Sequence, residues 1–154
     1  MYADSAALLA VTPELPDDLP VLLSEPVTWE VEYRIFALDG KPVTISPYFR
    51  NGELVYEQLR GWFAPPEEQA DAVAFATDVL NHTASGLPPG IVLDVGSVAE
   101  RGFAVVEANP AWASGLYGCD PAGALAVVAA SVRDRAALRE DNRRFARPAI
   151  IIEP

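Results

Sequence analysis

The strongest constraint on the fold is a single turn signal, the pair Asp39-Gly40 placed between two β-rich runs. The first run covers residues 28–38, and the second covers residues 41–49. Asp-Gly between two such runs is the strongest short-range signal for a β-hairpin. We therefore predict that the ordered part of the chain starts with two antiparallel strands.

A helix, a second hairpin and a last helix follow this strand pair. Residues 65–68, Pro-Pro-Glu-Glu, predict a helix start, because proline suits the first turn and acids suit the positive end of the helix dipole. Residues 91–98 and 103–108 predict the second hairpin, and Asp120 followed by Pro121 predicts the cap of the last helix. The order strand-strand-helix-strand-strand-helix predicts an α+β fold, an antiparallel sheet with helices packed on one face.

The sequence divides into a lead-in, one domain and an extension. Residues 1–20 are rich in Pro and Asp and predict an irregular lead-in, and residues 21–132 form the predicted domain. Residues 133–154 predict a charged helical extension with a β-prone tail. Five arginines alternate with acids between positions 133 and 144, a pattern that favours a solvated surface over an anion site.

Composition limits the classes of partner. With 154 residues, 51% of them apolar, the chain is long enough to bury a core. Acids outnumber bases 22 to 11, and a net charge of −11 repels phosphate backbones, which argues against nucleic-acid binding. No apolar run approaches the roughly 20 residues of a membrane span, and residues 1–4 lack the positive charge of a signal peptide. We therefore expect a cytoplasmic protein that does not bind membranes.

The second hairpin carries a candidate metal site. Glu107 and Asn109 are two residues apart and share a strand face, and a turn of two or four residues would place Asp94 directly opposite Glu107. Three oxygen donors meeting at one point suit Mg²⁺, whereas two carboxylates on a solvated face are the plain alternative. A three-residue turn would flip the register and weaken the metal interpretation. Because burying an unpaired carboxylate costs several kcal/mol, we expect a metal to neutralise Glu107 in this apolar strand.

Two segments resemble the C-terminal subdomain of the ATP-grasp superfamily. Residues 91–121, IVLDVGSVAERGFAVVEANPAWASGLYGCDP, resemble its Asp strand and the Glu-x-Asn-Pro strand that follows after a hairpin. Residues 22–40 resemble the hinge and the strand after it, and the similarity spans about residues 20–132. The ending is especially like a small branch of the superfamily that carries NPAW-SG-YGCDP.

The resemblance implies a nucleotide site that holds ATP and Mg²⁺. Asp94, Glu107 and Asn109 would hold the Mg²⁺ that bridges the ATP phosphates, and Arg34 would face those phosphates as the catalytic cation. Glu25, Val27 and Glu32 have the other implied roles, the first two lining the adenine and the third reaching the ribose. Glu32 and Arg34 share a strand face, and an ordinary surface ion pair is the alternative for them.

The resemblance also implies a reaction and an acceptor loop. Family members activate a carboxylate with ATP, and an amine or another nucleophile then attacks the acyl phosphate, which releases ADP and phosphate. Ser114, Gly115 and Tyr117 would contact the unidentified carboxylate substrate, and simple core packing is the alternative for Tyr117.

One part of the family pattern is missing. A complete ATP-grasp enzyme has further subdomains before the hinge, which supply lysines to the nucleotide. Here residues 1–21 precede the hinge-like segment, and Lys41 is the only lysine. Three explanations stay open: a piece of a longer ligase, a site completed by a partner chain or a second copy, or an inactive module kept for binding. We expect the chain to self-associate through the apolar surface that a missing subdomain would leave.

Overall fold

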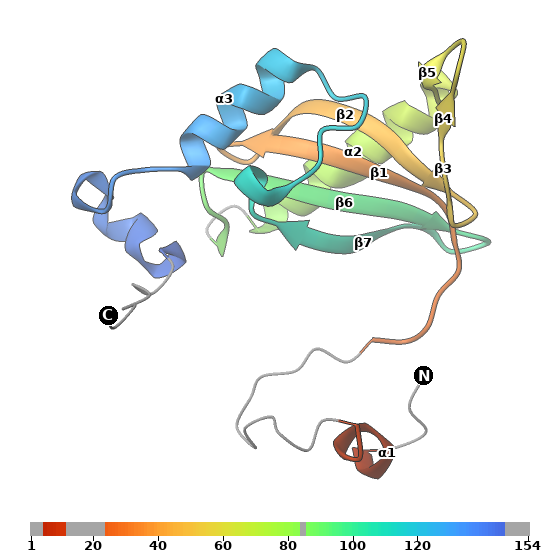
Figure 1. Ribbon diagram of the computed structural model, residues 1–154, viewed down its shortest axis with the longest axis horizontal. Helices are drawn as coiled ribbons and strands as arrows, with labels where there is room; N and C mark the ends of the chain where they lie inside the picture. The colour runs from red at the N-terminus through yellow and green to blue at the C-terminus, as the bar shows by residue number, and fades with distance from the viewer. Residues whose placement is uncertain (1–4, 12–23, 84–85, 147–154) are drawn as a thin grey trace.

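The computed structural model describes residues 5–11, 24–83 and 86–146, and its centre is a five-stranded antiparallel sheet (Figure 1). The strand order across this sheet is β3-β2-β1-β6-β7, and a two-stranded finger, β4-β5, projects beside it. In chain order the elements are α1 (Ser5–Leu9), β1 (Trp29–Leu38), β2 (Lys41–Arg50), β3 (Glu53–Leu54), β4 (Tyr56–Glu57), β5 (Gly61–Trp62), α2 (Pro66–Thr83), β6 (Gly90–Val98), β7 (Gly102–Asn109), η2 (Ala111–Ala113), α3 (Pro121–Ser131), η3 (Arg135–Ala137) and η4 (Glu140–Phe145).

The first hairpin has the turn that the sequence predicts. Leu38 pairs with Lys41, so Asp39 and Gly40 form a two-residue turn, with φ angles of 48° and 75°. Both values are positive, as a type I′ turn requires, and such a turn matches the twist of the strands it joins. The predicted strand pair is therefore confirmed.

The second hairpin reaches its predicted pairing by an unexpected route. Val98 pairs with Gly102, so the turn has three residues and not the expected two or four. One extra residue on β7, Val106, then forms a bulge that shifts the register by one position. Because the bulge cancels the effect of the odd turn, Asp94 still lies opposite Glu107. The expected turn length was wrong, and the expected pairing is confirmed.

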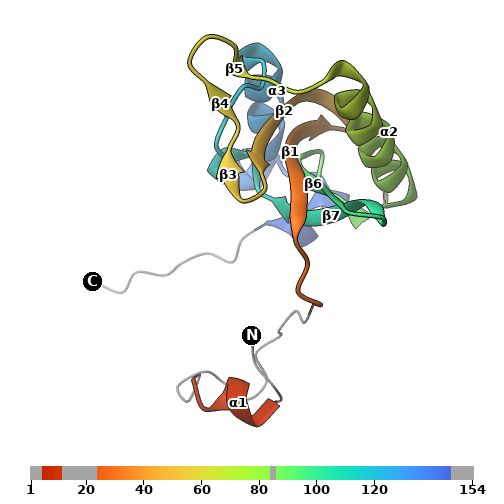
Figure 2. The same cartoon turned by 90° about the vertical axis from the view of Figure 1, so that its right-hand side faces the viewer.

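The α+β class with an antiparallel sheet is confirmed, but the two main helices lie on opposite faces of the sheet and not on one (Figure 2). The α2 face buries Val31, Tyr33, Ile35 and Ala37 of β1, Ile91, Leu93 and Val95 of β6, and Ala72, Ala76 and Leu80 of α2. The α3 face buries Phe36, Val92, Ala111, Cys119, Ala124 and Val127. Successive side chains of a strand point to opposite faces, so the unbroken burial along β6 from Gly90 to Gly96 requires cover on both.

Both helices begin as the sequence predicts. Helix α2 starts at Pro66, and Glu68 in its first turn accepts hydrogen bonds from Tyr33 Oη (2.5 Å) and Arg50 Nη2 (2.6 Å), which tie the helix to the sheet. Helix α3 starts at Pro121, and the Asp120 side chain accepts a hydrogen bond from its third backbone N–H at 2.7 Å.

The ends of the chain are described in part. Residues 5–11 contain only the short helix α1, and residues 135–145 form two 3₁₀ helices, η3 and η4. Residues 21–23, at the start of the predicted domain, and the predicted tail beyond residue 146 lie outside the described residues.

Candidate functional site

One row of polar residues crosses four strands on the α3 face of the sheet. Arg34 of β1 lies opposite Ser46 of β2 and opposite Asp94 of β6, and Asp94 lies opposite Glu107 of β7. Directly paired residues point to the same face, so these four side chains form a continuous line. Because the rest of this face is an apolar core under α3, the row concentrates its polar chemistry.

A buried ion pair stands at the centre of the row. Arg34 Nε donates to Asp94 Oδ1 at 3.0 Å, and Nη2 donates to Oδ2 at 2.6 Å. The exposed fractions of the two residues are 7% and 0%. Burial raises the pKa of Asp94 and the Glu107 carboxylate adds to this, while Arg34 opposes both. Burial alone would lower the pKa of Arg34, but Asp94 outweighs it and holds the guanidinium charged.

The loop between β7 and α3 closes over the arginine (Figure 1). Gly115 O accepts a hydrogen bond from Arg34 Nη1 at 3.2 Å. Arg34 Cζ lies 4.9 Å from the centre of the Tyr117 ring and 5.3 Å from that of the Tyr48 ring, and these two rings stack 5.1 Å apart. Tyr117 has a φ of 48°, a conformation that costs free energy in a non-glycine residue and is enriched at functional sites. The charge is therefore held by aromatic rings as well as by Asp94.

Close packing at Gly118 and Cys119 fixes this loop. Gly118 N donates to Ser46 Oγ at 3.0 Å, and Trp62 packs edge-on against Tyr117 at 5.1 Å. A Cβ atom on Gly118 would lie 2.5 Å from Trp62 Cβ and 2.8 Å from Ser46 Oγ, so only glycine fits. Cys119 Sγ donates to Arg34 O at 3.6 Å, and burial raises the pKa of this thiol to about 11. The loop therefore approaches the sheet as closely as backbone can.

Comparison with known proteins identifies the family. A family model described as an ATP-grasp domain, the second family of its clade, matches residues 1–127. The chain belongs to this family. No curated protein and no solved structure matches it.

Membership confirms the resemblance to the ATP-grasp superfamily and makes the chain an ATP-binding, ligase-type domain. The match spans most of the chain, and the assignment to the C-terminal subdomain and to its small branch stays a prediction. None of the helices within residues 5–11, 24–83 and 86–146 is long and apolar enough to cross a membrane.

In this ATP-grasp domain the three residues of the predicted metal set share one face. Asn109 pairs with Val92, two positions along from the Asp94–Glu107 pair, so its side chain is on the α3 face as well. Glu107 itself is exposed on the edge strand, so the expectation that it is a buried charge was wrong. The buried carboxylate is Asp94, and Arg34 compensates it.

The donor set fits Mg²⁺ held together with a polyphosphate. Mg²⁺ takes carboxylate and amide oxygens from one or two protein groups and fills its other positions with water or phosphate oxygens. No group of three or more His, Cys, Asp or Glu residues in the described ranges is placed to hold a metal. The two carboxylates and one amide at Asp94, Glu107 and Asn109 therefore suit a cation that arrives with a nucleotide better than a closed protein cage.

The residues implied in nucleotide binding do not all lie together. Glu32 lies two positions from Arg34 on the same face, and its Oε2 accepts a hydrogen bond from Tyr48 Oη at 2.8 Å. Arg34 is buried against Asp94, so the alternative of a surface Glu32–Arg34 pair is wrong. Glu25 is exposed and pairs with Arg101 at 2.6 Å, beside the β6–β7 turn. Val27 is half-buried just before β1.

The implied acceptor residues form the cover of the arginine. Ser114 Oγ donates to Pro110 O at 3.0 Å, so this hydroxyl is used inside the loop. Gly115 and Tyr117 both contact Arg34, and Tyr117 packs between Tyr48 and Trp62. The packing that the sequence left open for Tyr117 is therefore present, and contact with a substrate stays a prediction.

Sequence reasoning missed Ser46, Tyr48 and Trp62. A regular hairpin with the Asp-Gly turn would place Ile45 opposite Arg34, but an extra residue at Val43 shifts the register and brings Ser46 there. Tyr48 is the extra residue of a second bulge, and bulges turn side chains toward new directions. Proline inside a strand often marks a bulge, so Pro42 and Pro47, which stand next to the two bulges, were the available signal.

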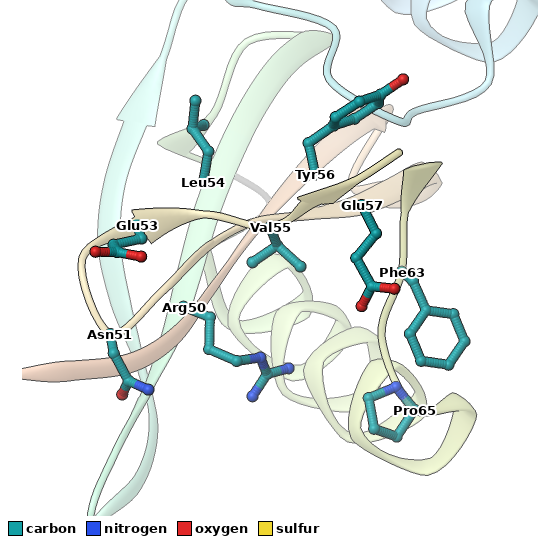
Figure 3. A pocket seen from close by; sticks show the side chains of 9 residues that line it. All are labelled: Arg50, Asn51, Glu53, Leu54, Val55, Tyr56, Glu57, Phe63 and Pro65. Carbon is teal, nitrogen blue, oxygen red and sulfur yellow. The ribbon is translucent and has the colours of Figure 1, made fainter. Parts of the chain in front are cut away.

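Two hollows lie outside this row. One, of about 600 Å³, lies beside the β3–β4 segment, where Arg50, Glu57 and Phe63 extend to one side while Leu54 and Tyr56 point the other way (Figure 3). Its charge is mixed, and Arg50 is bonded to Glu68. The other, of about 880 Å³, is lined partly by Asn109 and so adjoins the predicted metal set.

Proposed function

We propose that this ATP-grasp domain binds Mg-ATP on the α3 face of its sheet, as part of an ADP-forming ligase that joins a carboxylate to an amine or a related nucleophile through an acyl phosphate. The observation that carries the proposal is the row Arg34, Asp94 and Glu107, which places a cation and two carboxylates in register across three strands. The family gives the proposal its ATP-binding, ligase-type frame.

Each residue of the row has a distinct part in the proposal. Glu107, exposed beside Asp94, and the amide of Asn109 offer the oxygen ligands, and Asp94 holds Arg34 in place. Bound Mg²⁺ would bridge phosphate oxygens and neutralise their charge. Arg34 would supply the cation that faces the phosphates. Because Gly115 and Tyr117 cover it, this contact requires the loop to shift.

The nucleotide and substrate contacts complete the proposal. Glu32 would reach the ribose, and Glu25 and Val27 would line the adenine through the hinge backbone. Ser114, Gly115 and Tyr117 would lie at the acceptor end. Lys41, the only lysine, lies exposed at the β1–β2 turn, so we propose that a second copy or a partner chain supplies the phosphate-binding lysines. A cytosolic location is part of the same proposal.

The second candidate is an inactive binding module derived from an ATP-grasp domain. One observation favours it: both Asp94 oxygens already accept hydrogen bonds from Arg34, so the pair serves the fold by itself. A module of this kind would keep the sheet and the ion pair and would not need Mg-ATP.

Calorimetric titration with ATP, with and without Mg²⁺, tests the proposal. We expect binding that requires Mg²⁺ and that weakens about tenfold in Glu107→Gln, because one charged ligand is lost. Glu100→Gln, which removes an exposed acid from the β6–β7 turn, is the matched control and is expected to bind like the wild type. Binding that ignores Mg²⁺, equal effects of the two variants, or no binding would favour the inactive module for the chain by itself.

A further inference from the structure

A cleft at one end of the sheet has a chemistry unlike the rest of the molecule. It lies between the ends of β6 and β7, helix η2 and residues 130–146, and its volume is about 880 Å³. This volume is within the range of small-molecule sites, which is about 300–1,000 Å³. We call it the arginine cleft, after the side chains Arg133, Arg135 and Arg139 that line it.

The charge of the arginine cleft is opposite to that of the chain. Its lining contains three arginines and no aspartate or glutamate, although acids outnumber bases 22 to 11 in the whole sequence. Arg139 Nε has Asp141 Oδ1 at 3.4 Å, but both side chains are more than 60% exposed, so this pair screens the cleft weakly. A concave surface lined by one sign of charge focuses its field and attracts the opposite charge. The cleft therefore favours an anion.

The other lining residues indicate what the anion carries. Trp112, on η2, is 49% exposed and forms part of the wall, together with Ile91, Leu138 and Phe145. Asn109 and Asn142 add amide groups to the same lining. An apolar wall with a few polar groups that fix orientation is typical of sites for small organic molecules. The cleft thus suits an anionic group attached to an apolar body.

The position of the cleft connects it to the polar row. Asn109 lines the cleft, and two residues earlier on the same face of β7 lies Glu107. Much of the outer wall, from Ala130 to Ala146, lies beyond residue 127, where the match to the family ends. The wall is therefore a feature of this chain and not of the matched domain.

We propose that the arginine cleft binds a small organic anion with an apolar body, and that this ligand is a carboxylate. The carboxylate assignment deepens the proposed ligase function and rests on it, whereas the anion site rests on the cleft alone. This reverses the interpretation of residues 133–144 from the sequence, because the chain folds these arginines around a cavity and does not present them on one solvated helix.

An NMR titration of the full chain with three probes of one shape tests the proposal. Phenylacetate carries a carboxylate, phenyl phosphate a phosphate, and phenylacetamide no charge. We expect phenylacetate to shift the amide resonances of residues 108–112 and 131–146, and phenylacetamide to leave them in place at the same concentration. Equal shifts with phenylacetamide, or none with phenylacetate, would overturn the site. Tighter binding of phenyl phosphate would overturn the carboxylate assignment.

Variants separate this site from the nucleotide site. Arg133→Gln with Arg139→Gln is expected to weaken phenylacetate binding about tenfold or more, because two charged donors are lost. Arg60→Gln, which removes an exposed arginine from the β4–β5 finger, is the matched control and should bind normally. Glu107→Gln should also bind phenylacetate normally while losing Mg-ATP, so the two proposals fail separately. Equal weakening by Arg60→Gln would mean that only net charge matters, and would overturn the arginine cleft.

Discussion

Arg34 and Asp94 face each other across β1 and β6, and the guanidinium of one donates two hydrogen bonds, of 3.0 and 2.6 Å, to the carboxylate of the other. No buried side-chain nitrogen or oxygen in the described parts of the chain lacks a hydrogen-bond partner. Two opposite charges are thus buried together in the middle of the sheet, and each is stable there only because of the other.

Removal of Arg34 alone is expected to destabilise the domain strongly. Arg34→Met leaves the Asp94 carboxylate fully buried without a partner, and such a loss costs about 3–5 kcal/mol in the free energy of unfolding. Urea unfolding measures this difference directly. The double variant Arg34→Met with Asp94→Leu removes both charges and is expected to regain most of the loss.

The control for this prediction is an exposed pair. Arg101 and Glu25 are joined at 2.6 Å, but both side chains are about 60% exposed. Arg101→Met should therefore cost no more than about 1 kcal/mol. If Arg34→Met and Arg101→Met destabilise the domain equally, burial of the central pair does not have the importance given to it here.

Two glycines of the same loop are expected to differ sharply when each is changed to alanine. A Cβ on Gly118 would meet Trp62 and Ser46 at under 3 Å, so Gly118→Ala must displace the loop and should cost about 1–3 kcal/mol. A Cβ on Gly115 meets nothing closer than 3.5 Å, so Gly115→Ala should stay within about 1 kcal/mol of the wild type. Urea unfolding of both variants, with the near-ultraviolet signal of Trp62 and Tyr117, checks this. A destabilised Gly115→Ala beside a normal Gly118→Ala would contradict the packing described.

Acid is expected to weaken the attachment of α2 to the sheet. Burial alone would raise the pKa of Glu68, but the hydrogen bonds from Arg50 and Tyr33 outweigh it and hold that pKa below its ordinary value of 4.5. The ionised carboxylate therefore contributes stability that is complete above about pH 4.5 and is lost as the pH falls through the lower folded-state value. Glu68→Gln should cost about 1 kcal/mol at neutral pH, and this difference from the wild type should shrink in acid.

Stability measured by urea at several pH values tests this dependence. Glu67→Gln is the matched control, because it removes the same charge from the same helix turn, and Glu67 is exposed. We expect the acid-dependent difference to be specific to Glu68→Gln. A difference that stays constant down to pH 2, or one that both variants share, would show that the contacts of Glu68 do not cause it.

Local sequence patterns were enough for the elements and for part of the site. Asp39-Gly40 predicted a turn because both residues accept positive φ, and Pro66 and Asp120 predicted helix starts because they suit the first turn and the cap. The pairing of Asp94 with Glu107 was also predicted, although from the wrong turn length. Each of these patterns depends on residues close together in the chain.

Contacts between distant segments decided the rest. Whether α2 and α3 share a face depends on which residues of β1 and β6 each helix buries, and alternation along one strand does not contain that information. Bulges at Val43, Tyr48 and Val106 set which side chains meet Arg34 and Asp94, and a bulge forms only when two strands pair. The sequence by itself determined the strands, the turns and the helix starts. Only the tertiary structure decided that Arg34, and not a metal, neutralises the buried carboxylate, because burial and charge compensation are properties of the packed sheet.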